Sequence, residues 1–180
     1  PYTVITADSH AGASIATYRD YLDAKHQSLF DDWRGSYKNP QRKHIGSKKH
    51  KNWDDTERIG DMDMEGIAGE VIFPNTVPPF FRTSVLICGN PPADQYELRR
   101  EGIRAHNRWL ADFCSEEPHR RAGIGLIQLN DIDAAIEDVK WIAEHGLTGG
   151  VLLPLPSLDD VHLKQLDDPV YDRLWAAIQD

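Results

Sequence analysis

Residues 3–10 read TVITADSH, a short β-branched run that leads into an acid and a histidine. Three later apolar runs have the same compact form, namely Val71–Phe73, Ala122–Leu129 (AGIGLIQL) and Gly150–Leu153. All four are bounded by glycine, proline or polar residues, as β-strands usually are. The second and fourth runs do not alternate with polar residues, which favours strands covered on both faces. The sequence therefore predicts four short, largely buried strands.

The segments between these runs have helical patterns. Apolar residues recur at spacings of three and four between a predicted N-cap at Asn130 and a stop at Gly146. Asp168 followed by Pro169 predicts a further helix start, because proline suits the first helical position. Other helices are expected at Thr17–Trp33, Asp55–Glu65 and Asp94–Glu117.

Strands that alternate with helices predict right-handed β-α-β units and a parallel sheet, so the fold class is α/β. One domain is expected over residues 1–180. A closed barrel and an open doubly wound sheet both fit this pattern. The turn after the first strand, residues 8–14 (DSHAGAS), is not a GxGxxG loop, which removes the main support for a dinucleotide-binding fold.

The net charge and the cysteine content exclude several classes of protein. The chain carries 20 basic and 29 acidic residues, a net charge of −9. An acidic surface repels phosphate backbones and anionic lipid, so neither nucleic acid nor a membrane is expected as a partner. Cys88 and Cys114 match no metal-binding spacing and are interpreted as free thiols in a reducing cytoplasm.

One stretch differs from the rest in composition. Arg34–Lys51 holds seven lysines or arginines, two histidines and no acid. We interpret residues 34–53 as a basic, solvated insertion loop after the first helix, because charge runs are usually exposed. The sharper alternative is a lid or a subunit contact in a homo-oligomer that attracts an anionic substrate.

Asp8 and His10 are the strongest candidates for chemistry. Side chains two residues apart on a strand point the same way, so both can face one point at its carboxyl end. A carboxylate and an imidazole are competent ligands for zinc, manganese or iron. The alternative is that Asp8 caps a turn and His10 is an ordinary polar residue at a strand end.

A weaker group of candidates follows the second and fourth strands. Because barrel loops at the carboxyl ends of strands line the pocket, we expect substrate contacts there. Turn formation, apolar packing and a solvated loop are the structural alternatives for these positions. The candidate substrate-binding residues are Asn75, Thr76, Phe80, Phe81 and His162.

Several motifs together resemble the amidohydrolase-related family, a metal-dependent branch that includes aminocarboxymuconate-semialdehyde decarboxylase and resorcylate decarboxylases. The opening residues 6–13 (TADSHAGA) are similar to the family's first-strand signature. The order and spacing of the motifs carry the resemblance over nearly the whole chain. The other motifs are residues 61–75 (DMDMEGIAGEVIFPN), 107–110 (NRWL), 118–121 (PHRR), 146–151 (GLTGGV) and 168–175 (DPVYDRLW).

The resemblance implies the N-terminal half of a (β/α)₈ barrel, about four β/α units, with a divalent metal at its mouth. Many members carry His-x-His at the end of the first strand, but position 12 here is glycine. The family pattern therefore leaves Asp8 and His10 as the first-strand ligands of Zn²⁺, with Mn²⁺ as the alternative. Its remaining ligands, a mid-barrel histidine and a late aspartate, would lie beyond Asp180.

The implied function is a metal-dependent hydrolase or a carboxy-lyase acting on a small anionic or aromatic substrate. We expect residues 1–180 alone to be inactive and to need the C-terminal half of the barrel as a partner. The catalytic acid or base is not identified within the chain. The alternative function is a metal-free scaffold or interaction module that keeps the fold, because fold alone does not imply function.

Overall fold

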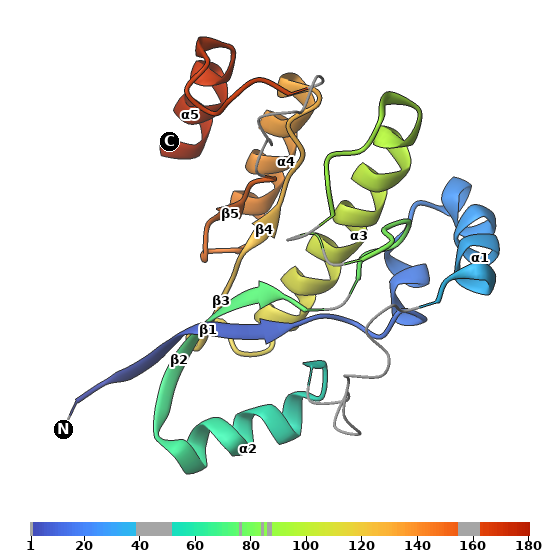
Figure 1. The fold of residues 1–180 in the computed structure, drawn as a ribbon. Helices are drawn as coiled ribbons and strands as arrows, with labels where there is room; N and C mark the ends of the chain where they lie inside the picture. Colours follow the sequence, from blue (N-terminus) through green and yellow to red (C-terminus); the bar gives the residue numbers. More distant parts are fainter. Residues whose placement is uncertain (1, 39–51, 76, 84, 86–87, 155–162) are drawn as a thin grey trace.

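The computed structural model describes residues 2–38, 52–75, 77–83, 85, 88–154 and 163–180. Strands and helices alternate along most of this chain (Figure 1). In order, the elements are β1 (Val4–Ala11), η1 (Thr17–Tyr21), η2 (Ala24–His26), α1 (Gln27–Ser36), α2 (Asp55–Glu65), β2 (Ile67–Pro74), η4 (Ala93–Gln95), α3 (Tyr96–Ser115), β3 (Arg121–Gly123), β4 (Gly125–Leu126), α4 (Ile132–Glu144), β5 (Val151–Leu152), η5 (Pro169–Tyr171) and α5 (Asp172–Gln179).

All paired strands are parallel, which confirms the predicted α/β class. One sheet has the order β1-β2-β3, and a second pairs β4 with β5. Only Ile124 separates β3 from β4, and its backbone nitrogen still donates to the Ile72 carbonyl at 3.0 Å. The spatial order therefore follows the order in the chain. In a doubly wound sheet the order of the strands reverses at a switch point, whereas in a barrel each strand lies beside the next one in the chain. The observed order therefore favours the barrel.

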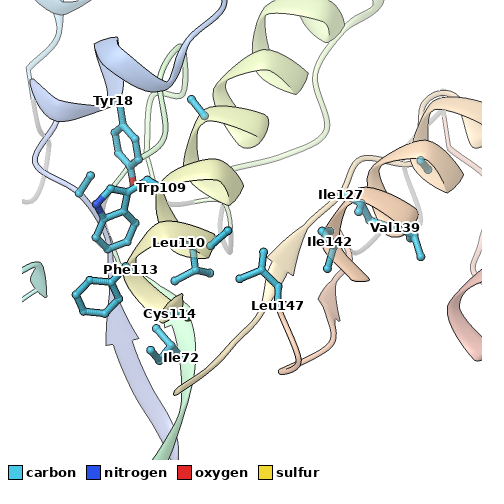
Figure 2. Close-up of a cluster of buried hydrophobic side chains, with 14 of the residues drawn as sticks. Tyr18, Ile72, Trp109, Leu110, Phe113, Cys114, Ile127, Val139, Ile142 and Leu147 are labelled. Atoms are coloured by element: carbon cyan, nitrogen blue, oxygen red, sulfur yellow. The ribbon is translucent and has the colours of Figure 1, made fainter. Parts of the chain in front are cut away.

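Helices cover one face of the strands. On β2, Ile72 is fully buried while Val71 and Phe73 on either side are only half-buried. Figure 2 shows Leu110, Phe113 and Cys114 of α3 on the side of the sheet where Ile72 lies, and the same core continues to Ile142 of α4. The other face lacks such a cover among the described residues, so side chains on that face are accessible.

Three sequence-based expectations are wrong in detail. The helix expected at Thr17–Trp33 is interrupted, because Leu22 and Asp23 have extended backbone angles. Asp131, not Asn130, caps α4 with a bond from Ala134 nitrogen to its carboxylate at 3.0 Å. The run Ala122–Leu129 is not one strand but forms parts of β3 and β4, in two different sheets.

The basic stretch falls largely outside the described residues. Residues 39–51 are not described, and Arg34 itself lies in the last turn of α1 rather than in a loop. After residue 51, the Asn52 carbonyl accepts a hydrogen bond from the Gly12 nitrogen at 3.2 Å, and Trp53 packs against the core. The predicted loop thus starts later than Arg34. Within the described part of the chain, no helix is both long and apolar enough to cross a bilayer.

Gly102 on α3 allows the loop after β2 to approach the helix. A Cβ atom at this position would lie 2.0 Å from the Pro79 carbonyl oxygen. Alanine normally stabilises a helix relative to glycine, but here we expect Gly102→Ala to lower the free energy of unfolding by about 1–3 kcal/mol. Urea denaturation measures the change.

Gly60→Ala on α2 is the matched control, because a Cβ there would meet no atom within 4 Å. We expect this variant to gain up to about 1 kcal/mol of stability. If Gly102→Ala proved as stabilising as Gly60→Ala, the close contact between α3 and Pro79 would be refuted.

His106 on α3 is buried, and only one of its two ring nitrogens has a hydrogen-bond partner among the described residues. It is 0% exposed, and its Nδ1 lies 2.8 Å from the Tyr18 hydroxyl, while Nε2 has no hydrogen-bond partner among the described residues. Burial disfavours the charged imidazolium and lowers the pKa of His106 to about 4. The unfolded chain therefore takes up a proton near pH 6.5, and the folded chain takes it up only near pH 4.

We expect stability to be unaffected by His106 above about pH 6.5 and to fall as the pH drops towards 4, by about 3 kcal/mol in all. His106→Gln removes this titration, so the variant should lose less stability than the wild type over that range. His119→Gln, at an exposed position, is the control for loss of an imidazole. Equal acid sensitivity in wild type and His106→Gln would contradict the assignment.

Candidate metal centre at the ends of β1 and β2

Asp8 and His10 lie close together on β1, near its carboxyl end. The His10 Nε2 atom is 3.4 Å from the Asp8 Oδ1 atom. The side chain of Asp8 is 92% exposed and that of His10 is 39% exposed. Both donor atoms are therefore accessible from outside, and they can approach one ion together.

Contacts with β2 orient the His10 ring. His10 is paired in register with Phe73, and the two rings lie 5.8 Å apart between centroids. The Nδ1 atom is 3.4 Å from the Pro74 carbonyl oxygen. In the tautomer with a proton on Nδ1, this nitrogen donates to the carbonyl and leaves the Nε2 lone pair free on the side of Asp8. A metal-ligating histidine commonly has this arrangement.

A buried charge network lies behind this pair on the opposite face of β1. Glu70 on β2 accepts bonds from the Ser9 hydroxyl at 2.5 Å and from Arg58 Nη2 at 2.6 Å. Arg58 also donates from Nη1 to the His10 carbonyl oxygen at 3.0 Å. The network therefore fixes the backbone between Asp8 and His10 and so controls where both side chains point.

The charges in this network are mutually compensated. The side chain of Arg121 is fully buried, with Nε 3.6 Å from Glu70 Oε1, and it also pairs with Asp55. Burial by itself would raise the pKa of Glu70, but hydrogen bonds from Arg58 and Ser9 and the positive charges of Arg58 and Arg121 lower it overall. Glu70 is thus held as a carboxylate. Sequence reasoning missed this residue, although an acid within the run IAGEVIFP was a visible signal.

Asn75 lies near Asp8 and His10, and its hydrogen bonds link neighbouring segments of the chain. It follows the last residue of β2, and its backbone nitrogen donates to the Ala11 carbonyl at 2.9 Å. Its side-chain amide donates to Asn52 Oδ1 at 2.7 Å. These bonds hold the ends of β1 and β2 together at the edge where Asp8 and His10 lie. Thr76 and His162, two other candidates for substrate contact, lie outside the described residues.

The two phenylalanines of the same loop have different environments. Phe80 has a positive φ of 68° and packs against Phe30 and Trp33, so its ring contributes to an aromatic cluster beside α1. Phe81 is 3% exposed and lines a cavity together with residues of β4 and β5. Phe81, and not Phe80, is among the residues that line this cavity.

The donor atoms at this edge are of the right type for a divalent metal, but among the described residues there are too few of them to complete a site. A carboxylate and a neutral imidazole are suitable ligands for zinc or manganese. The described residues contain no group of three or more histidine, cysteine, aspartate or glutamate side chains that could hold an ion. Asp8 and His10 can therefore supply two ligands, and any further protein ligand has to come from elsewhere.

No family model and no curated protein matches the sequence. Solved structures do match over nearly the whole chain. An amidohydrolase from Mycobacterium avium subsp. paratuberculosis is similar with a TM-score of 0.65 and 18% identity over 98% of this chain. A 5-carboxyvanillate decarboxylase from Sphingomonas paucimobilis is similar with a TM-score of 0.61 and 19% identity over 99% of this chain. A 2,6-dihydroxybenzoate decarboxylase is similar with a TM-score of 0.59 and 21% identity over 99% of this chain. The chain therefore shares its fold with part of each of these proteins.

The likeness covers only part of each similar structure. The chain spans 56% of the Mycobacterium amidohydrolase, 49% of the 5-carboxyvanillate decarboxylase and 48% of the 2,6-dihydroxybenzoate decarboxylase. It thus corresponds to about half of a TIM-barrel chain, which confirms the fold expected from the sequence. The sequential strand order and the helix-covered outer face agree with this assignment.

Proposed function

We propose that this chain is part of a metal-dependent enzyme that removes the carboxyl group of a small aromatic acid. The observation that carries the proposal is the pairing of Asp8 and His10, 3.4 Å apart, on the accessible face at the carboxyl end of β1. In barrels of this kind, active sites lie at the carboxyl ends of the strands. The fold is shared with decarboxylases of aromatic acids.

In this proposal Asp8 and His10 hold the ion, and the rest of the chain positions them. Arg58 fixes the His10 carbonyl, and the Pro74 carbonyl fixes the imidazole ring. When bound, a divalent metal supplies Lewis acidity, which polarises a carboxylate or carbonyl oxygen of a substrate. A second half of the barrel would contribute the remaining ligands and the proton-transfer group.

The choice of metal and substrate class rests on the similar structures. A 5-carboxyvanillate decarboxylase from Novosphingobium aromaticivorans has bound manganese and a nitro-substituted hydroxybenzoic acid, with 22% identity and a TM-score of 0.61. In this chain, the Phe73 ring beside His10 offers an aromatic surface next to the proposed ion. We therefore favour manganese or zinc and a hydroxylated benzoate as substrate, with hydrolysis as the alternative reaction.

A metal-free scaffold is the second candidate function. It is favoured by the small number of ligands, since no cluster of three metal-binding side chains occurs in the part of the chain that the structure describes. The two candidates differ in one observable, the metal content of the intact protein.

The test is to purify the intact protein, treat it with a chelator, add Mn²⁺ or Zn²⁺, and assay 2,6-dihydroxybenzoate for release of CO₂ and benzamide for release of ammonia. The proposal requires CO₂ release that chelation abolishes and metal restores. Release of ammonia alone would make the enzyme a hydrolase and overturn the decarboxylase assignment. Neither product, with no metal retained, would favour the scaffold.

A further inference from the structure

Arg99 on α3 is buried without a carboxylate beside it. The residue is 7% exposed, and its guanidinium donates to Gln95 Oε1 and to the Gly89 carbonyl, both at 3.2 Å. Its Cζ lies 5.2 Å from the Phe81 ring centroid, and its Nε atom has no hydrogen-bond partner among the described residues. The acceptors that it reaches in this part of the chain are a carbonyl, an amide and a sulfur atom.

That sulfur atom belongs to Cys88, which lies in the loop between β2 and η4. The Arg99 Nη1 atom donates to Cys88 Sγ at 3.0 Å. Cys88 is half-buried and is one of the residues around a cavity of about 340 Å³, so small molecules can approach it. The thiol is therefore both accessible and in direct contact with a buried positive charge.

The charge of Arg99 makes the thiolate the favoured form of this pair. A guanidinium does not lose its proton in a protein, so its burial leaves a positive charge that neutral acceptors do not cancel. A buried charge is costly unless it is paired. Burial by itself opposes ionisation of Cys88, but the cation is present in either case, and the thiolate is the group in reach that would neutralise it. Reactive cysteines occur in partly exposed, positively charged surroundings of this kind, because the thiolate is the nucleophile.

We propose that Cys88 is a reactive thiolate and a site of reversible oxidation by hydroperoxides, with Arg99 as its counter-ion. The thiolate attacks one peroxide oxygen, so that a sulfur–oxygen bond forms and the oxygen–oxygen bond breaks. The sulfur gives up two electrons and becomes a sulfenic acid, and the other peroxide oxygen leaves as hydroxide and takes a proton from water. The inference does not depend on the metal or on the reaction proposed above.

Reversal uses a thiol from solution. A first thiol molecule forms a mixed disulfide with Cys88 and releases water, and a second one displaces Cys88 as the free thiol. Cys114, the other cysteine of the chain, is unsuited to this step because it is 4% exposed in the core. Burial also raises the pKa of the Cys114 thiol to about 11, so little thiolate forms there at neutral pH.

The first measurement is the rate at which iodoacetamide alkylates each cysteine of the intact protein at neutral pH, read by mass spectrometry of the peptides. The reference is the same cysteine in urea-unfolded protein, because partial burial alone would slow Cys88 in the folded state. One hydrogen bond to a charged group raises the ionised fraction by about tenfold, and the stabilised thiolate loses about threefold in intrinsic nucleophilicity. Folded Cys88 should therefore react about threefold faster than unfolded Cys88. A slower reaction in the folded protein would overturn the proposal.

Variants of Arg99 test the role of its charge. Arg99→Gln keeps a hydrogen-bonding side chain without the charge and should slow alkylation of Cys88 by about threefold or more. Arg99→Lys keeps the charge and should retain most of the wild-type rate. Arg82→Gln, at an exposed arginine of the same loop, is the matched control and should leave the rate unchanged. A folded Arg99→Gln protein that reacts at the wild-type rate would contradict the assignment.

The wild-type protein gives a readout that needs no change at Arg99. At neutral pH its ultraviolet spectrum should contain the absorbance of one thiolate, which alkylation of Cys88 removes and which Cys88→Ser lacks. Absence of this band would refute the thiolate.

Hydrogen peroxide tests the oxidation itself. After a brief exposure of the intact protein, dimedone, which traps sulfenic acids, should label Cys88 and not Cys114. A thiol reductant added before dimedone should prevent the labelling. Equal labelling of both cysteines, no labelling of Cys88, or labelling that the reductant does not prevent would each overturn the proposal.

Discussion

Replacing Glu70 with alanine is expected to destabilise the protein by about 3–5 kcal/mol, enough to unfold many domains of this size. The carboxylate is 2% exposed and compensates the buried guanidinium groups of Arg58 and Arg121. Its loss removes the carboxylate that pairs with Arg58 and one of the two carboxylates beside Arg121, and leaving buried charge uncompensated costs more than the pair itself contributes. Urea denaturation of the purified variant measures the effect.

Glu65→Ala is the matched control, since this glutamate is exposed at the end of α2. We expect its effect to stay within about 0.5 kcal/mol. The low pKa of Glu70 also gives a pH signature. Its contribution to stability is present above the pKa of an unfolded glutamate and is lost as the pH falls through the lower, folded value. A stable Glu70→Ala protein with wild-type acid sensitivity would refute the network.

Removing either member of the Asp8–His10 pair is expected to weaken Mn²⁺ or Zn²⁺ binding by about 100-fold or more. Loss of a residue that merely orients a ligand already costs about 10–100-fold in affinity, so loss of a ligand should cost at least as much. Activity on an aromatic acid should fall in proportion at limiting metal. Titration of chelator-treated Asp8→Ala and His10→Ala proteins with metal gives the affinities.

Two exposed side chains supply the controls for these variants. Asp32→Ala removes an acid from α1, and His119→Ala removes an imidazole before β3. Neither change should alter the metal affinity, and thermal unfolding should show all four variants folded. If Asp8→Ala and His10→Ala bound metal as well as these controls, the proposed centre would be wrong.

Regular periodicity made much of the fold predictable from the sequence. The helix Asp55–Glu65 is observed at its predicted bounds, and α3 falls within the predicted Asp94–Glu117. The stop at Gly146 is also confirmed, because this residue has a φ of 74° after α4. These features depend on neighbouring residues, so a local pattern is sufficient to locate them.

Tertiary contacts decided the features that the sequence did not predict. The break near Asp23 is fixed by α3, since Asp23 nitrogen donates to Glu101 at 2.8 Å and its carboxylate pairs with Arg108. Asn130 is not a cap, since its Oδ1 accepts no bond from the described residues, while its amide nitrogen donates to the Pro91 carbonyl at 3.4 Å. Such partners are far away in the chain, and no local pattern encodes them.

The candidate site was likewise predictable only where its geometry depends on neighbouring residues. The spacing of Asp8 and His10 was enough to place both side chains on one face of a strand, because a strand repeats every two residues. The supporting roles of Arg58 and Glu70 depend on the pairing of β1 with β2 and were not predicted.

The most direct test of the metal assignment is an anomalous diffraction map from crystals of the intact protein grown with Mn²⁺. We expect one strong peak about 2.0–2.2 Å from both an Asp8 carboxylate oxygen and His10 Nε2, the usual bonding distances for such ligands. A peak at other residues, or no peak beside Asp8 and His10 at saturating metal, would contradict the assignment.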